Sequence, residues 1–283
     1  MSSIYKSGAK INLFLHILGK RPDGYHDLES LFYFPEVYDE IEITEGTGDR
    51  LQVTGRFGSD LQENLNQNII LKTYSLLKIL YSTKLPDLNF KLTKNLPVAS
   101  GIGGGSANAA TVLKALNENY KLGLSASQLY KIGARLGADV PACIMDRTCF
   151  AQGIGDVLAD VGEFPKLNIL LVNPLVPVST AEIFKMGFGV YTAPLKKNLS
   201  FKTTQNLLDL LEGTRNDLEN NAKKICPEIN DVLNSIKAQS GCLLSRMSGS
   251  GATCFGIFET KDKALIAKDT ILSKNPGWWT EVG

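Results

Sequence analysis

Histidine is rare in this sequence, and neither sign of charge is in excess. The 283 residues include 2 histidines, and 30 lysines and arginines stand against 29 aspartates and glutamates, for a formal net charge of +1. A chain without a basic excess lacks the electrostatic footprint of a nucleic-acid-binding protein, so we expect no nucleic-acid partner. His16 has no second ligand at metal-binding spacing, and we interpret it as structural.

Paired cysteines and long apolar runs are also missing, and we expect no leader segment. The 5 cysteines are widely spaced and contain no C-x-x-C pair, which is typical of reduced thiols in a cytoplasmic protein. No apolar run approaches the ~20 residues of a membrane helix, and residues 1–6 lack the apolar core of a signal peptide. The sequence therefore predicts a cytoplasmic protein without a membrane partner.

The chain is long enough to bury a large hydrophobic core. With 43% hydrophobic residues over 283 positions, one large domain or two ordinary domains can form. No feature of the sequence decides the oligomeric state, so a monomer and a homodimer both stay open.

A glycine-dense stretch separates two segments of different periodicity. Residues 88–93 alternate as in a half-buried strand, and residues 109–120 carry apolar side chains at helical spacing. Between them, residues 96–107 read Leu-Pro-Val-Ala-Ser-Gly-Ile-Gly-Gly-Gly-Ser-Ala. Without Cβ atoms, backbone N–H groups can close on an anion at a helix start, where the dipole favours negative charge. The stretch predicts a phosphate-binding loop, and a purely structural turn is the alternative.

Two common phosphate loops are excluded by the residues around these glycines. A Walker A loop ends in Gly-Lys-Ser/Thr, whereas Gly105 is followed by Ser106 and Ala107. A dinucleotide fingerprint needs a third Gly or Ala at Ser106 and an acidic residue opening a second strand, but Glu118 falls inside the expected helix. The sequence also lacks the His-Arg-Asp and Asp-Phe-Gly elements of protein kinases.

Two charged side chains stand in patterns that can hold them in place. Residues 9–19 alternate as a strand, and Lys10 and Asn12 share one face of it. Asp139 stands between a helix expected over residues 125–136 and a Val-Pro step, where proline restricts the backbone. A solvated lysine and a helix-capping aspartate fit these patterns, and so does a pair of functional groups.

An aromatic residue and a histidine follow a Pro-Asp-Gly turn. Tyr25 and His26 come directly after this turn and before an apolar segment that we expect to be a strand. A tyrosine face can stack on a base, and an imidazole can hydrogen-bond to a pyrimidine edge. A structural histidine is the alternative.

Four motifs, spread over nearly the whole chain, resemble those of one family. They are Ala-Lys-Ile-Asn-Leu at 9–13, Pro-x-x-x-Gly-Ile-Gly-Gly-Gly-Ser-Ala-Asn-Ala-Ala at 97–110, Gly-Ala-Asp-Val-Pro at 137–141 and a second glycine turn within 246–258. The set resembles the GHMP small-molecule kinases, such as galactokinase, homoserine kinase and mevalonate kinase. The resemblance implies an α+β fold of two domains, a ribosomal-protein-like domain over residues 1–153 and a ferredoxin-like α/β sandwich over residues 154–283, with substrates between them.

The resemblance also implies an ATP-dependent reaction and a role for each motif. Asp139 would be the catalytic acid/base, and Lys10 would lie beside the transferred phosphoryl group. Mg²⁺ is expected with ATP, and Ser106 is the candidate protein ligand. The implied ATP-binding residues are Asn68, Lys94, Pro97, Val98, Ala99, Ser100, Gly101, Ile102, Gly103, Gly104, Gly105, Ser106 and Ala107.

Within the family, Gly-Tyr-His is a mark of one substrate. It implies a small molecule, a cytidine-diphosphate-linked methylerythritol, phosphorylated on its 2-hydroxyl for isoprenoid precursor biosynthesis. Tyr25 and His26 would bind the cytosine, Asn12 and Asp139 would also contact the substrate, and Phe184 is either a second stacking face or part of the core. The alternatives are a kinase of the homoserine or mevalonate type and a catalytically silent nucleotide- or RNA-binding module.

The remaining periodicity predicts elements around these motifs. Residues 41–44 and 51–54 are expected to form a hairpin across Gly46 and Gly48. Ser125 and Gln128 have capping-box spacing. The second half is expected to be an antiparallel sheet with helices on one side.

Overall fold

A computed structural model describes residues 3–48, 50–195 and 201–283. The chain folds into two compact units that alternate along the sequence. The first unit comprises Met1–Lys10, Tyr38–Val98 and Gly103–Arg147, and the second comprises Ile11–Val37, Ala99–Ile102 and Thr148–Gly283. The chain thus passes between units inside the glycine stretch, at Ile102 and Gly103. The domain division expected at residue 153 stays a prediction.

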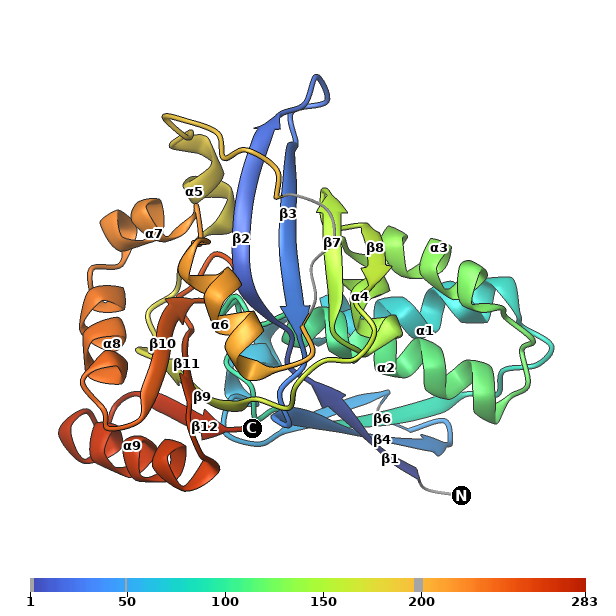
Figure 1. Ribbon diagram of the computed structural model, residues 1–283. Helices are drawn as coiled ribbons and strands as arrows, with labels where there is room; N and C mark the ends of the chain where they lie inside the picture. The colour runs from blue at the N-terminus through green and yellow to red at the C-terminus, as the bar shows by residue number, and fades with distance from the viewer. Residues whose placement is uncertain (1–2, 49, 196–200) are drawn as a thin grey trace. The chain divides into compact units, whose positions relative to one another are not determined.

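The first unit contains a four-stranded mixed sheet with the strand order β1-β4-β6-β5. Its strands are β1 (Ser3–Gly8), β4 (Tyr38–Glu45), β5 (Leu51–Thr54) and β6 (Leu88–Thr93). Its helices are the 3₁₀ segment η1 (Ser59–Gln67), α1 (Ile69–Leu80), α2 (Gly104–Asn119), α3 (Ala126–Leu136) and α4 (Val140–Met145) (Figure 1).

Helix α2 is the central element of this unit. It packs against β1 and β4 and also against α1, α3 and α4. Its small and aliphatic side chains, among them Ala109, Val112 and Leu116, are fully buried, because alanine lets neighbouring elements approach closely on several sides. The start of α2, which carries the glycines, is therefore held by the packing of the whole unit.

The expected hairpin between residues 41–44 and 51–54 does not form, and that prediction was wrong. β4 pairs antiparallel with β1 and β6, whereas β5 pairs in parallel with β6. β6 therefore lies between the two segments. The glycines between β4 and β5 suggested a tight turn, but the chain reaches β6 from β5 through α1, as a parallel crossover requires.

The second unit contains two antiparallel sheets of four strands, with the orders β2-β3-β7-β8 and β10-β11-β9-β12. Their strands are β2 (Ile11–Lys20), β3 (His26–Tyr33), β7 (Cys149–Gly153), β8 (Val157–Asp160), β9 (Asn168–Asn173), β10 (Cys242–Met247), β11 (Cys254–Phe258) and β12 (Trp279–Val282). Its helices are α5 (Thr180–Lys185), α6 (Thr204–Glu212), α7 (Glu219–Ile225), α8 (Glu228–Lys237) and α9 (Lys261–Lys274).

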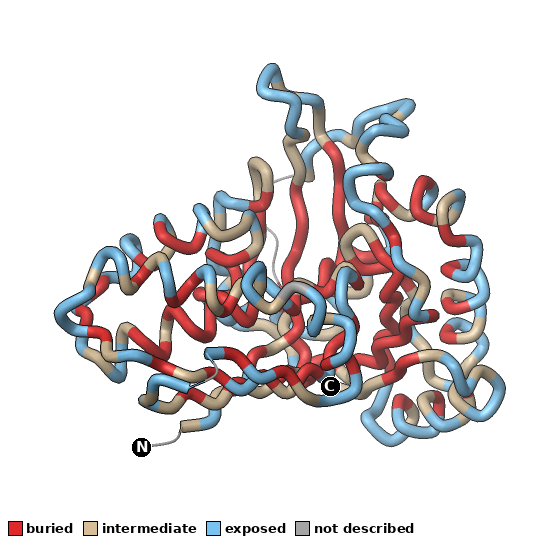
Figure 2. Tube along the Cα trace, turned by 180° about the vertical axis from the view of Figure 1, so that it is seen from behind, coloured by how far each residue is buried: buried red, intermediate tan, exposed pale blue. Residues whose placement is uncertain are grey.

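The core of the second unit forms where α8 and α9 pack on the second sheet. Apolar side chains of β2, such as Leu15 and Ile17, join the same core. Strand β2 is buried on both faces over residues 11–17, and its polar residues Asn12 and His16 are as buried as its apolar ones. Figure 2 shows this as long red stretches in the β2–β3 hairpin. The alternation of polar and apolar residues in β2 therefore does not separate a buried face from an exposed face, because both faces are buried.

The structure confirms the α+β class and the antiparallel sheet expected in the second half. The capping box at the start of α3 is present with both of its hydrogen bonds, between Ser125 and Gln128. Among the residues that the structure describes, no helix is both long and apolar enough to cross a membrane.

Candidate active site

Lys10 and Asp139 form an ion pair within the first unit. Lys10 Nζ lies 2.8 Å from Asp139 Oδ2, with the lysine side chain 5% exposed and the aspartate side chain 35% exposed. Asp139 stands at the N-cap position of α4, but its side chain makes no capping hydrogen bond. Two motifs 129 positions apart in sequence therefore place a buried cation against a carboxylate that solvent can reach.

The start of α2 lies beside this pair. Gly103 has a φ of +65°, and a Cβ atom there would lie 3.3 Å from Cβ and 3.4 Å from Cε of Lys10. The first helical hydrogen bond runs from the Ala107 N–H to the Gly103 carbonyl, at 2.8 Å. The N–H groups of Gly104, Gly105 and Ser106 precede it and have no acceptor four residues back within the helix. They form a positive helix end next to the lysine.

Ser106 lies near the segment that carries the aspartate. A Cβ atom built on Gly137 would lie 3.8 Å from Ser106 Oγ, and Gly137 is two positions before Asp139. Within residues 3–48, 50–195 and 201–283, no group of three or more His, Cys, Asp or Glu side chains gathers as a metal site. Mg²⁺ bound to a nucleotide needs few protein ligands because it keeps waters and takes phosphate oxygens. Ser106 stays the predicted ligand.

Two of the residues expected to bind ATP have structural partners within the first unit. Lys94 is buried, and its Nζ lies 2.6 Å from Oδ2 of the fully buried Asp39. Burial lowers the pKa of Lys94, and Asp39 opposes that shift. Asn68 is the N-cap of α1 and accepts a hydrogen bond from the Ile70 N–H at 3.0 Å. Their roles in ATP binding stay predictions.

The second unit holds the first part of the glycine loop against the second glycine turn. Pro97 and Val98 end a segment of the first unit, and Ala99–Ile102 belong to the second. Gly101 has a φ of +76°, and a Cβ atom there would lie 2.5 Å from the Ser248 carbonyl oxygen. Only glycine fits this approach. The Ser248 hydroxyl donates to the Gly101 carbonyl oxygen at 3.0 Å.

Asn12 is tied to the same serine. Its backbone N–H donates to Ser248 Oγ at 3.1 Å, and its side-chain Nδ2 donates to Ser30 Oγ at 2.8 Å. Asn12 is 3% exposed, so the strand and both glycine turns of the second unit are joined through Ser248. The predicted substrate contact of Asn12 stays a prediction.

The three residues expected at a cytosine ring all belong to the second unit. Tyr25 lies in the turn between β2 and β3 and is 62% exposed. The ring centroids of His26 and Phe184 are 5.1 Å apart. Phe184 also packs on the core of this unit, and its stacking on the cytosine stays a prediction. Burial and Lys20 lower the pKa of His26.

Sequence reasoning missed several residues that support the site. Asp39 accepts hydrogen bonds from the backbone N–H groups of Asn95 and Leu96, directly before the glycine loop, at 2.8 and 2.9 Å. Nothing in the pattern of β4 distinguishes it from the other acidic residues of that strand. Arg246 and Ser248 lie inside a recognised motif, but only the fold shows which backbone groups they bind.

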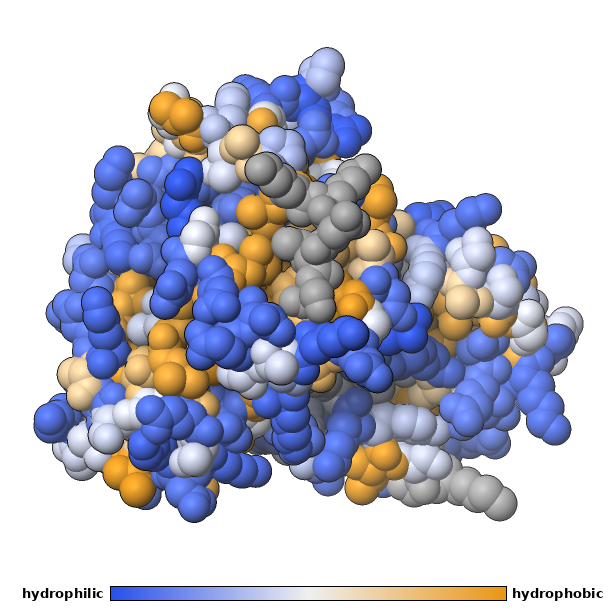
Figure 3. Space-filling view, in the orientation of Figure 1, coloured by the Kyte–Doolittle hydropathy of each residue, from blue (hydrophilic) through white to orange (hydrophobic). Residues whose placement is uncertain are grey.

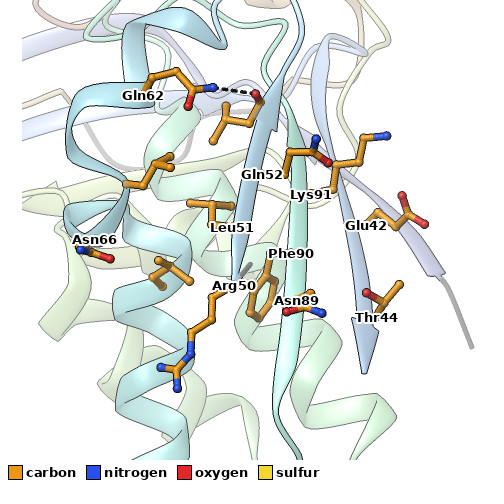
Figure 4. Close-up of a pocket in the computed structure, with 13 residues that line it drawn as sticks. Glu42, Thr44, Arg50, Leu51, Gln52, Gln62, Asn66, Asn89, Phe90 and Lys91 are labelled. Carbon is orange, nitrogen blue, oxygen red and sulfur yellow. Dashed lines mark hydrogen bonds between the residues drawn. The ribbon is translucent and has the colours of Figure 1, made fainter. Parts of the chain in front are cut away.

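A shallow polar pocket of about 810 Å³ lies elsewhere in the first unit. Figure 4 shows its lining from β4, β5, β6 and the η1 segment, with the Gln62 side chain donating to the Val53 carbonyl oxygen. None of the predicted site residues is in this lining. The residues at the start of α2 are therefore the better candidate for chemistry.

Comparison with known proteins supports one family over nearly the full chain. The model of the GHMP kinases N terminal domain matches residues 68–147, and that of the GHMP kinases C terminal matches residues 195–276. A 4-diphosphocytidyl-2-C-methyl-D-erythritol kinase from Chelativorans sp. is 43% identical over 272 residues, which cover 96% of this chain and 92% of the relative. The protein of the same name from Mesorhizobium japonicum is 41% identical, covering 98% and 94%.

Solved structures agree with the sequence comparison. A crystal structure of 4-(cytidine 5'-diphospho)-2C-methyl-D-erythritol kinase matches with a TM-score of 0.81 and 26% identity, covering 99% of this chain and 98% of that one. A mevalonate kinase from L. major matches with a TM-score of 0.67 at 16% identity, covering 99% and 96%. A homoserine kinase from Cytophaga hutchinsonii reaches 0.63 at 17%, covering 100% and 93%. These last two matches concern the fold alone.

Proposed function

Because the chain belongs to the 4-diphosphocytidyl-2-C-methyl-D-erythritol kinase family of the GHMP kinases, we propose that it phosphorylates the 2-hydroxyl of that cytidyl compound with ATP. The product would serve isoprenoid precursor biosynthesis. The observation that carries the proposal is the Lys10–Asp139 pair beside the start of α2. A cation, a carboxylate and free helix N–H groups are what phosphoryl transfer needs from a protein.

Asp139 orients the attacking hydroxyl and accepts its proton. The oxygen of the substrate forms the new bond to phosphorus while the bond between the γ-phosphorus and the bridging oxygen of ATP breaks. A carboxylate is far less basic than an alkoxide, so the proton moves late, when the hydroxyl oxygen is already bonded to phosphorus. The exposed fraction of Asp139, 35%, leaves the carboxylate accessible to a substrate.

Lys10 neutralises the charge that develops on the transferred group. Its ammonium is held in place by Asp139 and by the close approach of Gly103 to its aliphatic stem. A cation that is already positioned stabilises the transition state without reorganising during the reaction. The same arrangement keeps the Asp139 carboxylate and the Lys10 ammonium at hydrogen-bonding distance from each other.

The start of α2, which carries Gly103, Gly104 and Gly105, binds the phosphates of ATP through its backbone N–H groups. Magnesium would supply charge neutralisation on the ATP phosphates, and Ser106 is the protein group that we propose would hold it. Tyr25, His26 and Phe184 bind the cytosine through ring stacking and hydrogen bonds to its edge. The protein acts in the cytoplasm, as its composition predicts.

The test is ADP release from the purified protein with three acceptors offered separately. We expect turnover with 4-diphosphocytidyl-2-C-methyl-D-erythritol and none above background with homoserine or mevalonate at equal concentrations. Turnover of homoserine or mevalonate, without turnover of the cytidyl compound, would show that the protein is a kinase of another substrate class in the superfamily. Absence of turnover with all three, in a folded protein that binds ATP, would favour a silent binding module.

A further inference from the structure

His26 is held at the base of a hairpin turn. It is the first residue of β3 and pairs across the hairpin with Lys20 of β2. Arg21 bonds to Asp23 and Asp27, and Asp23 accepts the Tyr25 N–H at 3.1 Å, which fixes the turn before His26. The backbone on this side of the imidazole is therefore well defined.

Three aromatic rings surround this imidazole, and two of them were not expected from the sequence. The centroid of His26 lies 5.1 Å from that of Phe184, 5.3 Å from that of Phe188 with an edge-on interplanar angle of 76°, and 6.5 Å from that of Tyr191. Phe184 and Phe188 also contact each other edge-on at 5.7 Å. Such geometries are favourable for aromatic pairs beyond the area that they bury.

The segment that carries Phe188 and Tyr191, residues 187–192, is held by hydrogen bonds at both ends. Before Phe188, Asn221 Nδ2 donates to the Gly187 carbonyl oxygen at 2.9 Å. After Tyr191, the Thr192 N–H donates to the Ile17 carbonyl oxygen of β2 at 2.9 Å. The Thr192 hydroxyl donates to Asp217 Oδ2 at 2.7 Å, and Asp217 Oδ2 also accepts the Ile17 N–H.

Apart from Phe184 and Phe188, the apolar side chains of residues 184–191 are exposed. Met186, Val190 and Tyr191 are 46%, 84% and 41% exposed. Figure 3 shows isolated orange spots among mostly blue residues at the upper left, where Figure 1 draws the segment after α5. Phe184 and Phe188 pack on the core of this unit, and Thr192, which follows them, is held by a hydrogen bond to Asp217, whose side chain is 9% exposed.

We propose that Phe188 is a positioning residue that holds the imidazole of His26 for hydrogen bonding to the cytosine edge, with Thr192 and Asp217 fixing the segment that carries it. The inference rests on the proposed function, because that function supplies the pyrimidine. A cytosine edge presents one amino donor next to ring acceptors, and a neutral imidazole offers one donor and one acceptor. Rings that fix the imidazole reduce the freedom lost when substrate binds.

The burial that these rings provide is also consistent with a neutral imidazole. The pKa of His26 is lowered, first by burial and second by the positive charge of Lys20. The chain has 2 histidines, so the ring signals of His26 can be followed by NMR with His16 as an internal reference.

The test compares Phe188→Leu with Phe164→Leu, a matched loss of a half-buried ring in the same unit. Phe164 contacts Tyr33 and Phe201. In Phe188→Leu we expect the pKa of His26 to rise toward its ordinary value, while the titration of His16 stays unchanged. We expect the KM for the cytidyl substrate to rise about tenfold, with kcat and the KM for ATP retained, as the loss of one oriented hydrogen bond requires. Phe164→Leu should change neither quantity, and Phe188→Tyr should behave as the wild type.

A second variant covers the case in which Phe188→Leu does not fold. Thr192→Val deletes no ring but removes the hydroxyl that donates to Asp217 and accepts from Arg215, and so loosens the segment that carries the rings. It should shift the His26 titration and the KM in the same directions. An unchanged His26 titration, or a changed titration with an unchanged KM, overturns the positioning role. A wild-type protein that fails to phosphorylate the cytidyl substrate contradicts the proposed function instead, so the two failures are distinct.

Discussion

Lys10 and Asp139 illustrate what single residues in a sequence can and cannot predict. Each stands in a motif, and each has a common structural explanation, as a solvated lysine or a helix cap. The structure excludes both structural explanations, because the lysine side chain is 5% exposed and the aspartate makes no capping bond and lies 2.8 Å from the lysine; the catalytic roles stay a proposal. The residue types were readable from the sequence, and the distance between them was not.

Replacing Asp139 by asparagine tests the acid/base role. The change keeps size and hydrogen-bonding capacity but removes the charge and the ability to accept a proton. We expect kcat to fall by roughly 10² to 10⁴, with little change in melting temperature or substrate affinity, measured at saturating ATP and Mg²⁺. Asp146→Asn is the control, because Asp146 stands at the other end of α4 and bonds to Lys114. Wild-type turnover in Asp139→Asn would remove the proposed mechanism.

Gly103 and Gly105 separate two reasons for glycine in the loop. Gly103→Ala places a Cβ atom against Lys10 and strains a positive φ, so we expect lower stability and lower kcat together. Gly105→Ala meets no protein atom within 4 Å and lies in the first turn of α2, where alanine favours helix. If phosphates bind along this turn, Gly105→Ala should raise the KM for ATP without lowering the melting temperature. An unchanged KM for ATP would show that the phosphates do not bind at the first turn of α2.

At the scale of elements, the sequence predicted what depends on local pattern. The strand before the glycine loop, the helix after it and the capping box at Ser125 follow from periodicity and cap chemistry. The partner of β5 does not, because pairing with β6 depends on a crossover through α1 that no local signal encodes. Likewise, alternation in β2 could not reveal that both of its faces are buried.

Arg246 joins three elements of the second unit through buried carbonyl groups. Its guanidinium donates to the carbonyl oxygens of Leu13, Leu211 and Thr214, each at 2.8 Å. Burial lowers its pKa to about 10, so the side chain stays charged at neutral pH. It thus ties β10 to β2, next to Asn12, and to the end of α6.

Removing this guanidinium should destabilise the protein more than loss of a surface charge. Arg246→Met takes the guanidinium away from the buried carbonyl oxygens of Leu13 and Thr214, while the Leu211 carbonyl oxygen keeps the N–H and the hydroxyl of Thr214 as donors. We therefore expect a loss of about 3 kcal/mol in the free energy of unfolding, measured with urea. Arg246→Lys should recover only part of it, because an ammonium cannot span the same acceptors. Arg135→Met, at an exposed position of α3, should stay within about 0.5 kcal/mol of the wild type. Equal losses of unfolding free energy in Arg246→Met and Arg135→Met would contradict the role of Arg246 in holding β10, β2 and α6 together.

For the whole molecule, His16 links stability to pH through its buried position. It is 2% exposed. Nδ1 faces Glu29 Oε1 at 3.3 Å, and Nε2 accepts the Arg215 N–H at 3.4 Å. These two bonds fit a neutral ring with its proton on Nδ1, since a second proton on Nε2 would oppose the Arg215 N–H. Burial is the main reason that the pKa of His16 is lowered, while Glu29 and Asp217 act in the opposite direction.

Protonation of His16 should therefore favour the unfolded chain as the pH falls. Unfolded histidine binds a proton near its ordinary pKa of 6.5, whereas the folded protein resists it, so this stability is complete above that value and is lost as the pH falls through the folded pKa. His16→Asn retains an N–H donor toward Glu29 but cannot titrate. In urea unfolding between about pH 7.5 and pH 5, we expect the wild-type free energy to fall more steeply than that of His16→Asn, because other groups that titrate in this range contribute equally to both. Parallel curves would show that His16 takes up its proton equally in the folded and unfolded chain, and the neutral buried imidazole would have to be abandoned.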